Sequence, residues 1–425
     1  MAAERKEGLV GVSLLLFLLT MGNSVCGFAL HAVASRVLGP EDYGAFVSLL
    51  ALLMILAVPS QAVQMIVAKQ ITLELIQNQL RRAVVLTWQA VRWSAAAGML
   101  LWLAVTLALP VLKSFLHLPS ASPLLAVGAA IVLTLITPVL RGFLQGTQRF
   151  QALGWNFFLE GVGRLAWGAL FLLVGWGVLG AVLASAAGAL TAALIAVWLL
   201  GAAAKGLDRN GPEQPAARTS LGLQDYGWLV LVTMAAFFAL SNLDVLIVKH
   251  LFPQADAGYY SAGSLIGKAF LFLPYTFAQV LFPKASRHHA LGESTLSLLN
   301  RSLLYTAAAL LLGMIAVYAL APVLLSVLFG PEYNNPTTLR MIRYFGAAMT
   351  PLALVYVMMQ YSLALKNAEL SLLMLADLPV FIILLMTLPR SLEGVLLAMG
   401  LNFLILAAAG YAAIRAKAQP LAAKA

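Results

Sequence analysis

The sequence is poor in charge and almost free of cysteine. Only 10% of its 425 residues are charged and 62% are hydrophobic, whereas a soluble domain has about 25% charged and roughly 45–50% apolar residues. The single cysteine, Cys26, excludes an internal disulfide and a cysteine-based metal cluster. No Gly-x-x-x-x-Gly-Lys-Ser/Thr pattern occurs, so ATP hydrolysis within this chain is not predicted. The composition excludes an ordinary soluble core.

Basic residues outnumber acidic ones, but they do not cluster. The chain has 26 Lys and Arg against 16 Asp and Glu, which gives a formal charge of +10. A nucleic-acid footprint requires basic residues gathered on one face, and here they are scattered between apolar segments. We therefore expect membrane lipid and no nucleic acid as a partner, and we predict no cofactor.

Long apolar stretches fill nearly the whole chain. A helix that crosses a bilayer needs about 20 mainly apolar residues, and hydropathy with Gly, Pro and charge punctuation divides the sequence accordingly. We predict an all-α integral membrane protein of about 12 transmembrane helices, near residues 9–38, 42–69, 83–112, 122–148, 152–175, 178–204, 225–251, 257–283, 298–328, 336–366, 369–389 and 392–415.

A polar stretch divides these helices into two sets of six. We predict an N-terminal lobe over 1–204, a cytoplasmic linker over 205–224 and a C-terminal lobe over 225–425. Cytoplasmic loops carry most Lys and Arg, and with the N-terminus inside, one side holds fifteen of them and the other six. Both termini are therefore predicted to be cytoplasmic, in a cell membrane (inner or plasma membrane).

An internal repeat relates the two lobes. Pro40 and Pro253 lie 213 positions apart, as do Thr137-Pro138 and Thr350-Pro351. Such repeats are frequent in transporters. Because each lobe has an even number of spans, we expect a pseudo-two-fold axis along the membrane normal, with the substrate cavity between the lobes.

Several short motifs are similar to those of one transporter family. Residues 35–44, Ser-Arg-Val-Leu-Gly-Pro-Glu-Asp-Tyr-Gly, resemble the first-loop signature of Wzx-type oligosaccharide flippases. Asn242-Leu243-Asp244, Ala257-Gly258-Tyr259-Tyr260 and 328–333, Leu-Phe-Gly-Pro-Glu-Tyr, are similar to the family's patterns at corresponding places. These flippases belong to the multidrug/oligosaccharidyl-lipid/polysaccharide exporter superfamily.

The resemblance implies a function. It implies alternating access by two lobes, with a polyprenyl-diphosphate-linked oligosaccharide as cargo for the synthesis of cell-surface polysaccharide. Glycosyltransferases and the polymerase of the same pathway are the protein partners that we expect. The resemblance implies a transport function and no enzymatic one.

Four cations inside the predicted spans are candidates for a cargo site: Arg141, Lys268, Arg164 and Arg92. A charge at the bilayer centre costs about 2.5–3.5 kcal/mol on insertion scales, so such groups face a cavity or a partner. Arginine can hold diphosphate oxygens in a bidentate fork. The alternative is that these side chains snorkel to headgroups or pair internally.

For two of these cations the alternative is specific. Glu160 and Arg164 are four residues apart in the favourable order, which predicts an ion pair on one helical face. Arg92 lies between Trp88 and Trp93, a pattern that fits interfacial anchoring as well as cargo contact.

Asp244, Asn242 and Glu160 are candidates for ion coupling or gating. Asp244 lies inside a predicted span beside Asn242, and intramembrane carboxylates are functional by default. The residues leave two roles open for Asp244, the binding of a proton or Na⁺ and a pair with an arginine across the cavity. The alternative is a packing or gating ion pair with no part in transport.

Two other functions compete with the flippase. A drug/cation antiporter of the same superfamily would need cavity carboxylates, whereas the buried balance here is cationic. A membrane glycan-processing enzyme would need acids or bases that converge at one site, and the longest predicted loop offers only Asp208 and Glu213. We therefore predict a flippase.

Overall fold

The described part of the chain is helical. The computed structural model describes residues 2–77, 79–204, 226–271, 274, 285 and 295–422, and these contain no β-strand. The predicted linker over 205–224 lies outside the described residues. Contacts divide the chain into unit 1, Met1–Leu38 with Leu52–Gln224, and unit 2, Gly39–Ala51 with Asp225–Ala425.

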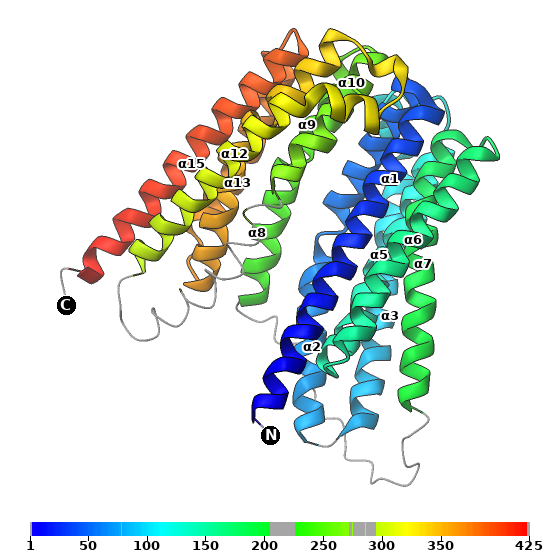
Figure 1. Ribbon diagram of the computed structural model, residues 1–425, viewed down its shortest axis with the longest axis vertical. Helices are drawn as coiled ribbons and strands as arrows, with labels where there is room; N and C mark the ends of the chain where they lie inside the picture. The colour runs from blue at the N-terminus through cyan, green and yellow to red at the C-terminus, as the bar shows by residue number, and fades with distance from the viewer. Residues whose placement is uncertain are drawn as a thin grey trace. The chain divides into compact units, whose positions relative to one another are not determined.

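Helices α1 to α7 supply unit 1, apart from the segment Gly39–Ala51 of α1 (Figure 1). Their bounds are α1 Ala2–Leu56, α2 Pro59–Ile76, α3 Leu80–Leu107, α4 Leu109–Phe115, α5 Ser122–Gly146, α6 Phe150–Leu173 and α7 Gly177–Ala204. The remaining elements supply unit 2: α8 Tyr226–Leu240, α9 Leu243–Leu251, α10 Gln254–Lys268, η1 Ala269–Leu271, α12 Leu296–Leu328, η2 Pro331–Tyr333, α13 Pro336–Ala364, α14 Glu369–Thr387 and α15 Leu392–Ala422.

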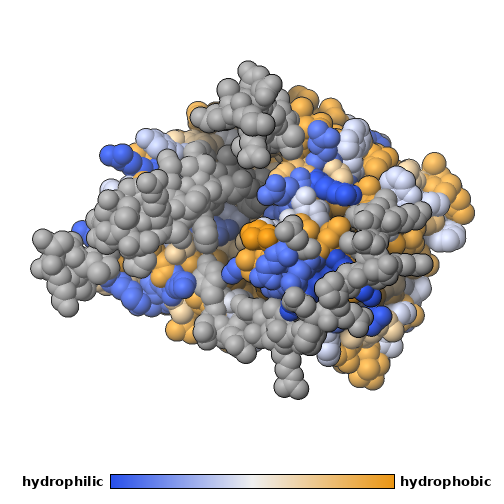
Figure 2. Space-filling view, turned by 90° about the horizontal axis from the view of Figure 1, so that it is seen from below, coloured by the Kyte–Doolittle hydropathy of each residue, from blue (hydrophilic) through white to orange (hydrophobic). Residues whose placement is uncertain are grey.

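The helices present apolar side chains on their outer faces. Ten helical stretches in the described residues are long and apolar enough to cross a membrane. Large apolar side chains such as Leu103, Leu312 and Leu404 are more than half exposed, a surface suited to lipid tails and not to water. Figure 2 shows strongly hydrophobic residues (orange) beside hydrophilic ones (blue) at one end of the helices. The chain is an all-α, multi-pass membrane protein.

Two predicted spans are interrupted. The span predicted over 42–69 is divided, because α1 continues to Leu56 and α2 begins at Pro59. Proline lacks a backbone N–H and suits the first position of a helix. The span predicted over 225–251 is divided between α8 and α9 at Ser241 and Asn242. The stretch Gly227–Leu251 is still long and apolar enough to cross a membrane, and hydropathy does not detect local breaks of this kind.

One central helix in each unit carries the repeated Thr-Pro pair. In unit 1, α5 contacts α2, α3, α6 and α7, and in unit 2, α13 contacts α8, α10, α12, α14 and α15. Each is 67% buried over its most apolar window, the highest share among the ten spans. Pro138 and Pro351 both lie inside these helices. The repeat found in the sequence therefore marks corresponding central helices.

Glycines four residues apart allow close helix contacts in both units. A Cβ on Gly142 or Gly146 of α5 would lie 2.8 or 2.7 Å from a backbone oxygen of α2. A Cβ on Gly263 or Gly267 of α10 would lie 2.6 or 2.2 Å from the side chain of Met341 or Phe345 of α13. Small residues at this spacing let membrane helices approach closely, so these four positions exclude larger side chains.

The segment Gly39–Ala51 packs within unit 2 although its neighbours in the chain belong to unit 1. Gly39 has φ 68° and ψ 177° and interrupts α1, a conformation that is essentially restricted to glycine. Tyr43 is fully buried and packs edge-on against Phe329 and Tyr333, with ring centroids 6.1 and 5.9 Å away. This aromatic contact holds the segment Gly39–Ala51, which contains the second part of the first-loop signature, within unit 2.

Candidate functional site

Arg141 lies at the centre of a buried polar cluster in unit 1. Its Nη2 is 2.5 Å from Oε2 of Glu160 on α6, and its Nε donates to Oδ1 of Asn156 at 2.7 Å. The guanidinium carbon also lies 3.9 Å from the ring centre of Phe157. Three contacts in different directions hold the planar group in one orientation.

Glu160 binds a second arginine. Nη2 of Arg164, one turn further along α6, lies 2.8 Å from Oε1 of Glu160. The side chains of Arg141 and Glu160 are 8% and 12% exposed, whereas that of Arg164 is 30% exposed. Two guanidinium groups thus share one carboxylate, and the cluster has one positive charge in excess.

Asn156 positions this cluster, and the sequence reading missed it. Its Nδ2 donates to the backbone oxygen of Ala192 on α7 at 2.7 Å, and the residue is fully buried. The amide is therefore fixed with its oxygen toward Arg141. The spacing of Asn156, Glu160 and Arg164, four residues apart each time, places them on one face of α6 and was the available signal.

A second buried charged cluster lies in unit 2. Asp244 of α9 is completely buried. One of its oxygens lies 3.0 Å from Nζ of Lys268, at the end of α10, and the other accepts a hydrogen bond from the Tyr260 hydroxyl at 3.0 Å. The side chain of Lys268 is 19% exposed. One cation and one carboxylate balance each other here. The hydrogen bond from Tyr260 to Asp244 was not predicted from the sequence.

Asn242 lies at the break between α8 and α9, and none of its described hydrogen bonds reaches Asp244. Its Nδ2 donates to the backbone oxygen of Phe238 at 2.9 Å and contacts the Ser241 hydroxyl at 3.0 Å. The amide thereby donates to a carbonyl in the last turn of α8, which also accepts a hydrogen bond from the Ser241 hydroxyl at 3.1 Å. The described contacts of Asn242 are those of a residue that caps an interrupted helix.

Arg92 is not part of the cluster around Arg141. It is exposed on α3, opposite the face formed by the buried Ala83, Thr87 and Ala90, and the described residues give it no ion pair. The structure thus brings together Arg141, Glu160 and Arg164 in unit 1, and Asp244 with Lys268 in unit 2.

Lys249 is a buried cation that is not among the candidate residues of the sequence analysis. It lies in the last turn of α9 and is 2% exposed. Its Nζ donates to the backbone oxygen of Glu41 at 3.2 Å and also to Oε1 of Gln254. These contacts bind the segment Gly39–Ala51 to α9 and α10 within unit 2.

The chemistry of the described clusters is electrostatic. The described residues contain no group of three or more His, Cys, Asp or Glu side chains able to hold a metal ion. Each cluster instead pairs one carboxylate with one or two cations, and an unpaired charge inside a membrane is costly. Such clusters can bind a charged group or exchange partners.

The comparison with protein families identifies the chain. A family model described as polysaccharide biosynthesis protein matches residues 11–289. The chain belongs to this family. No curated protein matches it significantly.

Solved structures identify the fold of this member of the polysaccharide biosynthesis protein family. An inward-facing multidrug resistance MATE family transporter of the MOP superfamily is similar with a TM-score of 0.72 at 13% identity, over 96% of this chain and 98% of that chain. Lipid II flippase MurJ in an inward closed conformation gives a TM-score of 0.66 at 12% identity, over 95% and 87%. The fold and the family match confirm the resemblance seen in the first-loop signature.

Proposed function

We propose that this protein moves a polyprenyl-diphosphate-linked oligosaccharide from the cytoplasmic to the outer leaflet of the cell membrane by alternating access, without a covalent reaction. Its membership of the polysaccharide biosynthesis protein family supports the pathway. The similarity of its fold to lipid II flippase MurJ supports movement of a lipid-linked cargo. In this proposal the two termini face the cytoplasm, and the partners are the glycosyltransferases and the polymerase of the same pathway.

The excess positive charge around Arg141 is the observation that carries the proposal. Two guanidinium groups share the carboxylate of Glu160, so the cluster can accept a further anionic oxygen without losing its internal pair. Arg164 is the more exposed of the two, and arginine suits phosphate because its donors form a planar fork. Arg164 is therefore the first contact for the diphosphate, and Arg141 holds Glu160 in place.

The other predicted residues have different parts in this proposal. Asp244 already neutralises Lys268, so Lys268 attracts an anion less than Arg164 does, and the pair is suited to gating or to coupling with a cation. Asn242 stabilises the break beside this pair. In this proposal Arg92 contributes to the positive electrostatic potential around the cytoplasmic half of α3 and does not contact the diphosphate.

The membrane potential alone can drive the proposed movement. Moving one charge across the membrane is worth about 2.3 kcal/mol per 100 mV. A doubly negative diphosphate that leaves a negative cytoplasm therefore gains roughly 4–5 kcal/mol at that potential. A coupling ion is not required by this energy balance.

Depletion of the protein tests the proposal. We expect lipid-linked oligosaccharide to accumulate on the cytoplasmic leaflet of depleted cells, and wild-type protein to remove it. Arg164→Gln and Arg141→Gln should each restore less than about a tenth of the wild-type rate of lipid-linked oligosaccharide translocation, because each removes a charge from the cluster. Arg390→Gln, which changes an exposed arginine between α14 and α15, should restore it fully.

The opposite result would favour the antiporter. If no lipid-linked intermediate accumulates and the depleted cells instead become sensitive to cationic drugs, the protein exports cations and the proposal is wrong. If Arg164→Gln rescues the cells as well as wild type does, the protein is still a flippase but Arg164 does not bind the diphosphate.

A further inference from the structure

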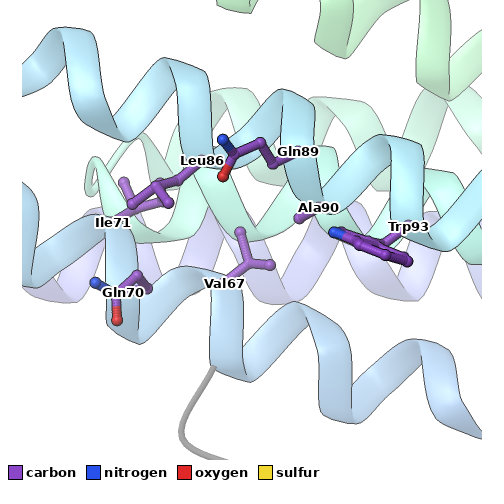
Figure 3. Close-up of a pocket in the computed structure, with 7 residues that line it drawn as sticks. All are labelled: Val67, Gln70, Ile71, Leu86, Gln89, Ala90 and Trp93. Carbon is purple, nitrogen blue, oxygen red and sulfur yellow. The ribbon is translucent and has the colours of Figure 1, made fainter. Parts of the chain in front are cut away.

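A groove lies between α2 and α3, within unit 1 and outside the cluster around Arg141. Figure 3 shows its walls, which include Val67, Gln70 and Ile71 of α2 and Leu86, Gln89 and Trp93 of α3. Its volume is about 120 Å³. The walls are mainly apolar, with two amide side chains, so the groove suits a hydrocarbon chain more than a sugar.

The groove opens on an apolar outer surface. Trp93, which lines the groove, is 73% exposed and lies on α3, a helix long and apolar enough to cross a membrane. Apolar side chains this exposed on membrane-spanning helices face lipid tails. A lipid from the surrounding leaflet can therefore reach the groove directly.

A basic residue lies at one end of the groove. Arg82, Leu86, Gln89 and Trp93 follow one another at intervals of four, three and four, and so form one stripe along α3. Arg82 is the third residue of the helix, and Trp93 lies about 16 Å further along at 1.5 Å per residue. The stripe therefore runs from a cation in the first turn of α3 to an apolar side chain about three turns further along the helix.

The guanidinium of Arg82 is held at this end by its neighbours. Its Nε lies 3.4 Å from Oε2 of Glu74, and its Nη1 donates to Oε1 of Gln79 at 3.2 Å. Gln70 donates to the other oxygen of Glu74 at 2.9 Å. The side chain of Arg82 is still 25% exposed, so it is positioned and accessible to a further acceptor.

The charge of this hairpin favours an anion. At the end where α2 meets α3 the sequence carries two cations, Arg81 and Arg82, and one acid, Glu74. Basic pockets between membrane helices bind anionic headgroups, and each Lys or Arg near the surface contributes about 1 kcal/mol to this attraction. A zwitterionic headgroup would gain less from the same residues.

We propose that the groove between α2 and α3 binds one anionic phospholipid. Its headgroup phosphate lies at Arg82 and one acyl chain lies along Leu86, Val67 and Trp93. This site uses none of the residues of the Arg141 cluster, so it does not depend on the cargo proposed above. The bound lipid covers the junction of two helices at the hydrocarbon boundary.

Native mass spectrometry of the full-length protein, released from nanodiscs of defined composition, tests this site. With phosphatidylglycerol we expect one tightly retained lipid per protein, and with phosphatidylcholine none. Arg82→Gln should lower the affinity for phosphatidylglycerol roughly fivefold, because it removes one cation at the headgroup. Gln89→Trp should abolish retention while leaving every charge in place, because its larger side chain fills the groove.

A matched variant separates this site from general attraction of anionic lipid. Arg301→Gln removes an exposed arginine near the start of α12 in unit 2, and it should retain phosphatidylglycerol as the wild type does. Equal loss in Arg301→Gln, or undiminished retention in Gln89→Trp, would overturn the proposal. Displacement of the lipid by polyprenyl diphosphate at equimolar concentration would also overturn it, because the groove would then belong to the cargo.

Discussion

The buried cluster around Arg141 in unit 1 and the buried pair of Asp244 and Lys268 in unit 2 differ in charge balance. In unit 1 two arginines share Glu160, whereas in unit 2 one lysine pairs with Asp244, which also accepts a hydrogen bond from Tyr260. The first cluster keeps a positive charge in excess and the second is neutral. The net positive charge in unit 1 therefore favours the binding of an anion, whereas the charges of the cluster in unit 2 neutralise each other.

Of the substitutions in the two clusters, removal of Glu160 should lower the stability of the protein most. In Glu160→Ala two guanidinium groups lose their shared carboxylate, and breaking a buried ion pair by removing one partner costs about 3–5 kcal/mol. We expect a large drop in the unfolding temperature of the purified protein, measured in detergent by fluorescence.

Glu369→Ala is the matched control for that measurement. Glu369 pairs with Lys417 at 3.2 Å, but the two side chains are 42% and 58% exposed. Exposed pairs contribute about 0–1 kcal/mol, so this variant should unfold close to the wild-type temperature. Equal losses in the two variants would mean that Glu160 does not stabilise unit 1 through its arginines.

A double-mutant cycle measures the coupling energy between Asp244 and Lys268 in the neutral cluster of unit 2. Asp244→Asn leaves Lys268 with an unbalanced charge, but the 19% exposure of that side chain should keep the loss below that of Glu160→Ala. Adding Lys268→Met removes the stranded charge and should recover at least half of the loss. A coupling energy near zero, outside the roughly 0.5–3 kcal/mol range of contacting residues, would show that the two charges do not act as a pair.

Tyr260 should have the smallest effect of the three. Tyr260→Phe removes one hydrogen bond to the Asp244 carboxylate, and hydrogen bonds to charged groups contribute about 1.5–3 kcal/mol. The neighbouring Tyr259→Phe is the control, because the described contact of Tyr259 is its ring against Tyr333. If both substitutions lower the unfolding temperature equally, the Tyr260 hydroxyl has no special role at Asp244.

Local patterns in the sequence predicted a good part of these clusters. The Glu160–Arg164 pair follows from a spacing of four on one helix and is confirmed. The contact of Arg141 with Glu160 joins α5 to α6 and depends on how the two helices pack, which the spacing of residues in the chain does not specify. The sequence likewise left open whether Asp244 binds a proton or Na⁺ or pairs with an arginine, because its partner also depends on how the helices pack.

The helices were predicted better than their breaks. Apolar length identifies a span, but a break depends on one proline or on one side chain that satisfies a backbone carbonyl, as Asn242 does at the end of α8. The burial of Lys249 was also not predictable, because its acceptor is the backbone oxygen of Glu41, more than two hundred residues earlier in the chain.

The placement of Gly39–Ala51 within unit 2 has a consequence for how the protein can be divided. A cut within residues 205–224 would leave this segment on the N-terminal fragment, although Tyr43 packs against Tyr333 and Lys249 binds the backbone of Glu41. The C-terminal fragment alone would lack these contacts. Two genes that encoded the halves separately would therefore encode an obligate complex, in which one polypeptide donates an element to the fold of the other, as in domain-swapped assemblies.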